Sequence, residues 1–223
     1  MVRRVARGPL IISVCHSKGG VGKTTTTLVV GKFLAKQYRV ALRDYDDTKQ
    51  LTDLVRSLDV VDGHITRRLW LDPGRSGLST YQQEPDMVLI DAEPARGPRT
   101  WQALREADYV LIPAPPEGLA VRAMRQMLET VELAAAQGNP ALQILGVVPT
   151  MFDRRWPEHH AFLEEMEHEC RQARIRLFPP VARRQSYLYL STQGQDYRPV
   201  AEAIQAALIK HQRHLSVGVR RSA

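Results

Sequence analysis

Short apolar runs alternate with longer amphipathic stretches along this chain. Five of the runs are rich in Val, Ile and Leu and are bounded by polar or turn-forming residues, which is typical of buried strands. They cover Leu10–Cys15, Val40–Leu42, Asp86–Asp91, Asp108–Pro113 and Leu142–Val148. Strands that are apolar along their whole length belong in a sheet whose two faces are both covered.

The stretches between these runs have helical periodicity. A helix is predicted from about Thr24 to Gln37, directly after the first strand and its loop. Apolar residues at helical spacing mark three more helices, over Met124–Ala135, Phe162–Ala173 and Val200–Leu208. The Met and Phe positions of these stripes indicate core faces rather than ligand sites. Residues 59–85, which are punctuated by Pro73, Gly74 and Gly77, are left unassigned.

Alternating strands and helices predict an α/β fold with a mostly parallel sheet and helices on both faces. The chain has 223 residues, of which 43% are hydrophobic, and this is enough for one domain with a substantial core. We therefore expect a single domain over residues 1–223, with short basic tails at both ends.

Composition narrows the possible classes of function. No apolar run approaches the ~20 residues of a membrane-spanning helix, and no secretory signal is evident, so a cytoplasmic protein is expected. Cys15 and Cys170 form no CxxC pair, which gives no basis for a disulfide framework or a zinc site. The net charge is +7, and the basic residues concentrate in residues 1–44 and 171–223. Such basic ends suit either a polyanion such as nucleic acid or an ordinary solvated surface.

A phosphate-binding loop is predicted between the first strand and the first helix. The run Lys18-Gly19-Gly20-Val21-Gly22-Lys23-Thr24-Thr25 ends in the Gly-Lys-Thr of a P-loop, although Ser17 occupies the first glycine position of the general pattern. Glycines allow backbone N–H groups to converge on phosphate oxygens, and the helix N-terminus favours negative charge. Lys23 would reach the β- and γ-phosphates of ATP, and the Thr24 hydroxyl would ligate Mg²⁺. The expected architecture is therefore that of a P-loop NTPase.

Carboxylates follow two other predicted strands. Asp91 ends an apolar run in the arrangement of a Walker B aspartate, and Asp44 and Asp46 end the second strand. Because ligands bind at the carboxyl ends of parallel strands, these side chains are candidates for holding Mg²⁺ and orienting the attacking water.

Lys18, directly before the run Gly19–Thr25, resembles the signature lysine of the deviant Walker A motif of the ParA/MinD superfamily. The segment Val40–Thr52 resembles that family's strand with Asp-x-Asp-Pro-Gln, followed by Leu-Thr. The resemblance implies that Lys18 reaches the nucleotide of a second subunit in an ATP-sandwich dimer. It also implies that Asp46 orients the water while Asp44 supports the metal shell. Asp47-Thr48 replaces the usual Pro-Gln, Ala92-Glu93 follows Asp91, and Arg43 occupies a usually apolar position.

Gly146–Arg155 resembles a segment of the ParA family that ends in Thr-Met-Tyr-Asp-Arg-Arg. This resemblance implies a plasmid or chromosome partition ATPase that uses ATP/ADP and Mg²⁺, forms a homodimer on binding ATP, and associates with the nucleoid. It would bind DNA non-specifically and hydrolyse ATP on stimulation by a ParB-like partner. Pro179, Pro180 and Val181 would lie near the adenine base. Candidate DNA contacts are Arg171, Arg174, Arg176, Arg183, Arg184, Arg213, Arg220 and Arg221.

Two alternatives remain open at this point. A MinD-like membrane- or cargo-positioning ATPase would need a C-terminal amphipathic helix, whereas His211–Ala223 offers few bulky apolar residues, so no stable membrane association is expected. A metabolic P-loop enzyme or an electron-transfer reductase would need a co-substrate or suitably placed cysteines.

Overall fold

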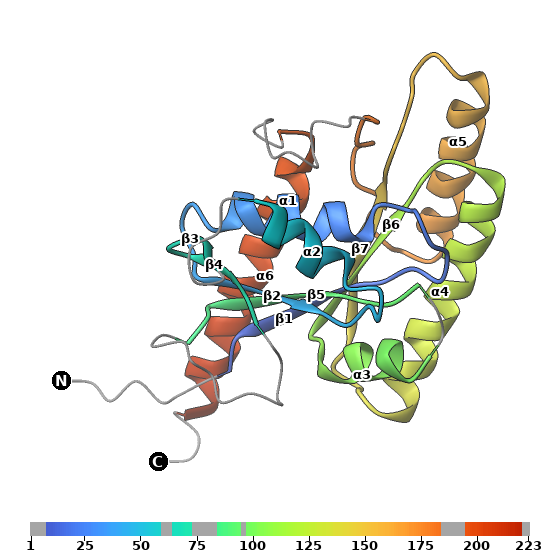
Figure 1. Ribbon diagram of the computed structural model, residues 1–223. Coiled ribbons are helices and arrows are strands. Elements are labelled where there is room, and N and C mark those ends of the chain that lie inside the picture. Colours follow the sequence, from blue (N-terminus) through green and yellow to red (C-terminus); the bar gives the residue numbers. More distant parts are fainter. Residues whose placement is uncertain (1–7, 59–63, 73–83, 95–96, 184–194, 220–223) are drawn as a thin grey trace.

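A seven-stranded sheet forms the centre of the molecule (Figure 1), whose computed structural model describes residues 8–58, 64–72, 84–94, 97–183 and 195–219. The strands are β1 (Leu10–Val14), β2 (Val40–Asp44), β3 (His64–Thr66), β4 (Leu69–Leu71), β5 (Met87–Asp91), β6 (Tyr109–Ala114) and β7 (Gln143–Pro149). Their order across the sheet is β3-β4-β2-β5-β1-β6-β7. Every neighbouring pair is parallel except β3 and β4, which are antiparallel. The five predicted strands and the mostly parallel sheet are confirmed.

Helices cover both faces of this sheet. They are α1 (Lys23–Leu34), α2 (Gln50–Ser57), α3 (Pro98–Glu106), α4 (Gly118–Gln137), α5 (Pro157–Gln172) and α6 (Arg198–Val219), with a short 3-10 helix at Gln195–Tyr197. Figure 1 shows α3, α4 and α5 on one side of the sheet and α1, α2 and α6 on the other. The expected three-layer α/β arrangement is therefore confirmed. None of these helices, over the residues described, has the length and apolarity needed to cross a bilayer.

Two hydrophobic clusters correspond to the two covered faces. Leu89 packs in the cluster that includes α1 and α6, while its strand neighbours Val88 and Ile90 pack in the cluster of α3, α4 and α5. Successive side chains of a strand point to opposite faces, so an unbroken apolar run is what a sheet between two helical layers requires. The predicted stripe containing Met124 and the one containing Cys170 both lie in the second cluster, as expected for core faces.

The stretch left unassigned in the sequence contains β3 and β4. Each strand has three residues, which is too short for a period of two to be recognised. β4 pairs with β2 and is buried at Leu69 and Trp70, whereas β3 lies at the edge of the sheet. This edge extends the sheet beyond the strands that carry the candidate site.

The strand order brings three strand ends together. β5 lies between β1 and β2, and Asp91 is in register with Val14 on one side and with Asp44 on the other. The loops that follow β1, β2 and β5 therefore leave the sheet at the same level. The glycine-rich loop and both candidate carboxylate segments meet at this edge.

Candidate functional site

The glycine-rich loop connects β1 to the first residue of α1. Gly20 and Gly22 have φ angles of +72° and +89°, which lie in the left-handed region that favours glycine. Gly22 is the residue directly before α1, so the loop ends where the first N–H groups of the helix are unpaired. Gly19 and Gly20 are exposed. This geometry provides backbone donors and a helix N-terminus for an anion such as phosphate.

Two side chains hold the loop in this shape. The hydroxyl of Thr150, at the end of β7, donates a 2.7 Å hydrogen bond to the carbonyl oxygen of Val21. Nδ1 of His16 accepts a 3.0 Å hydrogen bond from the N–H of Lys18. Thr150, Val21 and His16 are each only 1% exposed, so both bonds are sheltered from water. The loop is thus positioned by the protein itself.

His16 can act as an acceptor only while its ring is neutral. Burial, reinforced by the nearby charge of Lys23, lowers the pKa of His16 from 6.5 to about 4. Its Nε2 is buried without a hydrogen-bond partner. Near neutral pH the ring therefore stays neutral and keeps its bond to the Lys18 amide.

The two lysines of the motif extend in different directions. Lys23 is 6% exposed, and its Nζ donates to the carbonyl oxygen of Lys18 at 3.3 Å, so its ammonium group lies over the loop. Burial lowers the pKa of Lys23, while the charges of Asp91 and Asp46 oppose that shift. Nζ of Lys18 instead lies 3.5 Å from Oε2 of Glu117, the residue before α4, and its side chain is 36% exposed. The ammonium group of Lys23 thus lies at the loop, where a phosphate-binding lysine is expected, whereas that of Lys18 lies at Glu117.

Thr24 and Asp91 form the candidate metal centre. The Thr24 hydroxyl donates a 2.7 Å hydrogen bond to Oδ2 of Asp91, while Oδ1 of Asp91 is buried without a partner. Burial raises the pKa of Asp91 to about 7. A buried, unsatisfied carboxylate oxygen beside a hydroxyl is the donor set that a hard divalent cation prefers, so these residues fit Mg²⁺. No group of three or more potential His, Cys, Asp or Glu ligands occurs among the described residues, so water and phosphate oxygens would complete the shell.

Asp44 makes hydrogen bonds within its own loop. Its Oδ1 accepts the N–H of Asp46 at 3.0 Å, and its Oδ2 accepts the N–H and hydroxyl of Thr52 at 2.9 and 2.7 Å. Thr52 is the third residue of α2, so Asp44 satisfies an otherwise unpaired N–H at the start of this helix. The role of Asp44 in the metal shell therefore remains a prediction, beside a structural role that the contacts establish.

Arg43 and Glu93, two departures from the family pattern, have structural partners. Nη2 of Arg43 lies 2.6 Å from Asp72 and its Nη1 lies 2.9 Å from Glu106, so the half-buried guanidinium joins β2 to two neighbouring segments. Oε1 of Glu93 accepts the N–H of Thr100 at 3.2 Å, near the start of α3. Arg43 and Glu93 thus each contact a segment beside the site.

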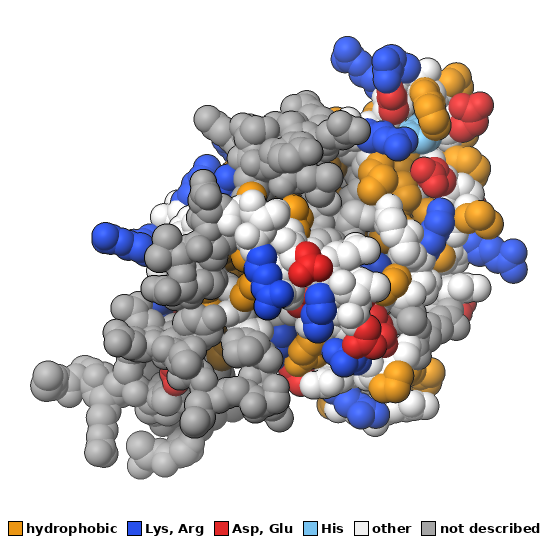
Figure 2. All heavy atoms as spheres, in the orientation of Figure 1, with side chains coloured by type: hydrophobic (Ala, Val, Ile, Leu, Met, Phe, Trp, Pro, Cys, Tyr) orange, Lys and Arg blue, Asp and Glu red, His pale blue; other side chains and the backbone are white. Residues whose placement is uncertain are grey.

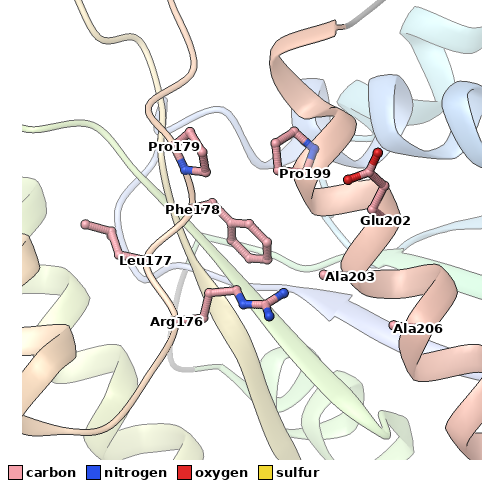
Figure 3. Close-up of a pocket in the computed structure, with 8 residues that line it drawn as sticks. All are labelled: Arg176, Leu177, Phe178, Pro179, Pro199, Glu202, Ala203 and Ala206. Atoms are coloured by element: carbon pink, nitrogen blue, oxygen red, sulfur yellow. The ribbon is translucent and has the colours of Figure 1, made fainter.

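The prolines expected near the adenine base lie on the segment after α5. Pro179 lines a cavity of about 400 Å³ between this segment and α6, into which the Phe178 ring faces (Figure 3). The other residues lining it are Arg176, Leu177, Pro199, Glu202, Ala203 and Ala206. Pro180 is exposed, whereas Val181 is buried in the core. Two of the three expected residues thus have surface available for a base, and the assignment remains a prediction.

The candidate DNA-binding arginines are distributed over several elements. Arg171 is in the last turn of α5, Arg174 and Arg183 are exposed on the segment that follows, and Arg213 is on α6. The guanidinium of Arg176 lies 5.6 Å from the centre of the Phe178 ring. Arg184, Arg220 and Arg221 lie outside the described residues. On the face in Figure 2, the described basic side chains are interspersed with acidic ones. Figure 2 therefore shows no continuous basic patch on that face.

Sequence reasoning missed three contributors to the site: His16, Thr150 and Glu117. His16 stands next to the recognised loop, where its acceptor role has no sequence signature. Thr150 and Glu117 are 129 and 99 positions away from their partners in the loop. Only their hydrogen-bond and ion-pair geometry identifies them.

The similarity of this chain to known proteins extends over the candidate site. The family described as the CobQ/CobB/MinD/ParA nucleotide binding domain matches residues 12–195. The chromosome-partitioning ATPase Soj of Thermus thermophilus is 31% identical over 174 residues, which cover 65% of this chain and 70% of Soj. Maintenance of carboxysome distribution protein A of Gloeothece citriformis is 26% identical over 227 residues, which cover 81% of this chain and 86% of that protein. Cobyrinic acid a,c-diamide synthase of Mycobacterium smegmatis, solved with bound ADP and magnesium, is 26% identical with a TM-score of 0.71 and covers 92% of this chain and 96% of its own.

Proposed function

Because the chain belongs to the CobQ/CobB/MinD/ParA family of nucleotide-binding proteins, we propose that it is a Mg²⁺-dependent partition ATPase that binds DNA as an ATP-bound homodimer. One observation carries the proposal. The strand order β2-β5-β1 places the glycine-rich loop, Asp91 and Asp46 at one edge of the sheet. That edge supplies donors for a triphosphate, a metal site and a carboxylate for water.

Each of these groups has a separate task in the hydrolysis of ATP to ADP and phosphate. The loop amides, the start of α1 and Lys23 bind and orient the phosphates. Thr24 and Asp91 would hold Mg²⁺, which would supply positive charge to neutralise the charge that develops on the phosphate oxygens. Asp46 accepts a hydrogen bond from the attacking water and directs it at the terminal phosphate. Phosphoryl transfer needs little covalent chemistry from the protein, so this positioning accounts for the catalytic role of the site.

Lys18 connects the site to a second copy of the chain. Its ammonium group is directed away from its own loop, toward Glu117, and is 36% exposed. A cation so placed can reach a phosphate bound by a facing subunit, where its effect would be similar to that of an arginine finger supplied in trans. The nucleotide then holds the two copies together, and hydrolysis releases them.

DNA and an activator are the proposed partners of the dimer. Exposed arginines such as Arg171 and Arg174 would contact phosphates without reading base sequence. A ParB-like activator would stimulate hydrolysis and thereby release DNA. The relationship to the Soj protein of Thermus thermophilus supports this assignment.

A MinD-like ATPase that acts at a membrane or positions a cargo is the second candidate. The relationship to maintenance of carboxysome distribution protein A supports an assembly as cargo. Membrane attachment through α6 is less well supported, because Val200, Ile204 and Leu208 on its apolar face are buried against the core. A reductase is also disfavoured, because Cys15 and Cys170 are buried.

A binding experiment tests the proposal. Random-sequence double-stranded DNA is titrated with the protein without nucleotide, with ADP and with ATP, each with Mg²⁺, between about 50 and 200 mM salt. We expect tight binding with ATP alone and a steep loss of affinity as salt rises. Vesicles of anionic lipid provide the parallel arm. Binding to vesicles in place of DNA would favour the second candidate, and equal DNA binding in all nucleotide states would refute the ATP-gated mechanism.

A further inference from the structure

The carboxylate of Asp46 is oriented by a residue two positions further along the chain. Oδ1 of Asp46 accepts the hydroxyl of Thr48 at 2.7 Å and the N–H of Thr48 at 2.9 Å. Both bonds end on the same oxygen, and Oδ2 takes part in neither. Asp46 is 7% exposed, so the acceptor of both bonds is buried, whereas Thr48 itself lies at the surface. The two oxygens of the carboxylate therefore differ: Oδ1 is hydrogen-bonded to Thr48, and Oδ2 is not.

The turn that carries this pair is anchored at both ends. At its start, the N–H of Asp46 donates to Asp44, whose carboxylate also accepts Thr52 of α2. At its end, the N–H of Lys49 donates to the carbonyl oxygen of Asp46 at 3.1 Å. The backbone of the turn is therefore held by bonds that do not involve the Thr48 side chain. Removing the Thr48 hydroxyl would free the Asp46 side chain while leaving those backbone bonds in place.

The neighbouring residue Asp47 makes a different kind of contact. Its carboxylate is 2.7 Å from Nη2 of Arg99 on α3, with side chains that are 71% and 44% exposed. An exposed ion pair contributes little to stability and is screened by salt. Of the two departures in this turn, only Thr48 touches the carboxylate that the proposed chemistry needs.

We propose that Thr48 is a positioning residue for ATP hydrolysis, and this inference rests on the proposed role of Asp46. The hydroxyl of Thr48 saturates Oδ1, so that Oδ2 is the oxygen that receives the hydrogen bond of the attacking water. A hydrogen bond from a hydroxyl to an ionised carboxylate is short and strong, and it holds one rotamer of the carboxylate. Thr48 itself touches neither water nor nucleotide in this role.

Replacing Thr48 tests the inference, because valine keeps the shape of threonine and removes the hydroxyl. Thr48→Val should lower kcat about tenfold, which is the size expected for loss of one charge-assisted hydrogen bond, and leave ATP affinity and KM unchanged. Thr48→Ser, which retains the hydroxyl, should restore kcat to near the wild-type value. Wild-type kcat in Thr48→Val, or no restoration in Thr48→Ser, would overturn the inference.

Two further variants distinguish positioning from a general effect on the turn. Asp47→Ala perturbs the same turn and leaves the Thr48 hydroxyl in place, so kcat should stay within about twofold of wild type. In an Asp46→Ala background, Thr48→Val should cause no further loss, because the group it positions is absent. An equal loss of kcat in Asp47→Ala, or full additivity with Asp46→Ala, would contradict a role through the carboxylate.

Failure of the proposed function gives a different pattern. If Asp46→Ala hydrolyses ATP at the wild-type rate, the proposed role of Asp46 is wrong, whatever the Thr48 variants do. If Asp46→Ala is slow and Thr48→Val is not, only the positioning role of Thr48 is wrong. Thermal unfolding of each variant confirms that rates are compared between folded proteins.

Discussion

The phosphate site and the arginines of the C-terminal third differ in how their charged groups are held. In the phosphate site, Lys23 and Asp91 are buried and each makes a specific hydrogen bond. Among the arginines, Arg171 is exposed and lies 4.0 Å from Glu167 on the same helix, and Arg174 is exposed on the following turn. Groups fixed by burial act at one position, whereas exposed charges act through their number and density. A single substitution should therefore have a large effect in the first region and a small one in the second.

The largest effect is expected at Lys18, which is partly exposed but is held at one position by its ion pair with Glu117. Lys18→Ala should reduce hydrolysis on the order of a thousandfold, the range found for trans-acting cations in phosphoryl transfer. It should also abolish the ATP-dependent dimer, because the second subunit loses its charge on the nucleotide. ATP should still bind, since Lys23 and the loop amides remain. Steady-state hydrolysis, analytical ultracentrifugation with ATP and nucleotide titration measure these three properties.

Lys36→Ala is the matched control, because it removes an equal charge at an exposed position beyond the end of α1. It should leave hydrolysis and dimerisation unchanged. Wild-type turnover in Lys18→Ala would contradict the trans role, and comparable losses in both variants would show that only total charge matters.

An intermediate effect is expected on the stability of the folded protein when the pH is lowered, because His16 becomes protonated. Because the pKa of His16 is about 4 in the folded protein and near 6.5 when exposed, the unfolded chain binds a proton that the folded chain does not. The contribution of His16 to stability is therefore fully present above pH 6.5 and decreases as the pH falls toward 4. At about pH 5 the loss should be ~2 kcal/mol.

Denaturant unfolding without nucleotide, at about pH 7.5 and pH 5, measures this loss as the difference between the wild type and His16→Asn, because Asp91, whose pKa is raised to about 7, gains stability over the same pH interval in both proteins. His16→Asn retains an acceptor for the Lys18 amide and removes the titrating ring, so on acidification it should lose ~2 kcal/mol less stability than the wild type. His160→Asn, which replaces an exposed histidine, is the control and should behave as the wild type does. An identical pH dependence in His16→Asn would show that another group is responsible.

The smallest effects are expected at the arginines. Arg171→Ala or Arg174→Ala should each weaken ATP-dependent DNA binding a few-fold and reduce the slope of log K against log salt by about one. The double variant should combine the two losses. Fluorescence anisotropy across a salt series measures both quantities. Complete loss of binding in one single variant would mean that this arginine is fixed in a specific contact, and the contrast between the two regions would then disappear.

Much of the fold and part of the site could be predicted from the sequence. The apolar runs identified β1, β2, β5, β6 and β7, because a strand buried on both faces has few polar positions. They did not identify β3 and β4, where three residues are too few for periodicity to appear. The glycine-rich loop could be recognised because its chemistry is contiguous in the chain. Bonds such as Thr150 to Val21 could not, because they join residues 129 positions apart.

The sequence by itself determined which residues are candidates for the proposed chemistry: the loop from Lys18 to Thr25, and the carboxylates Asp46 and Asp91. A motif, and the position of a residue at the end of a strand, depend only on neighbouring residues in the chain. Both can therefore be recognised from the sequence without a structure. The tertiary structure decided how those residues are held and where they point. It directed Lys18 to Glu117, placed the His16 ring under the Lys18 amide, and assigned the Thr48 hydroxyl to one oxygen of Asp46. A hydrogen bond forms only where the distance between donor and acceptor is correct to within a few tenths of an ångström. Only the packing of the folded chain sets these distances.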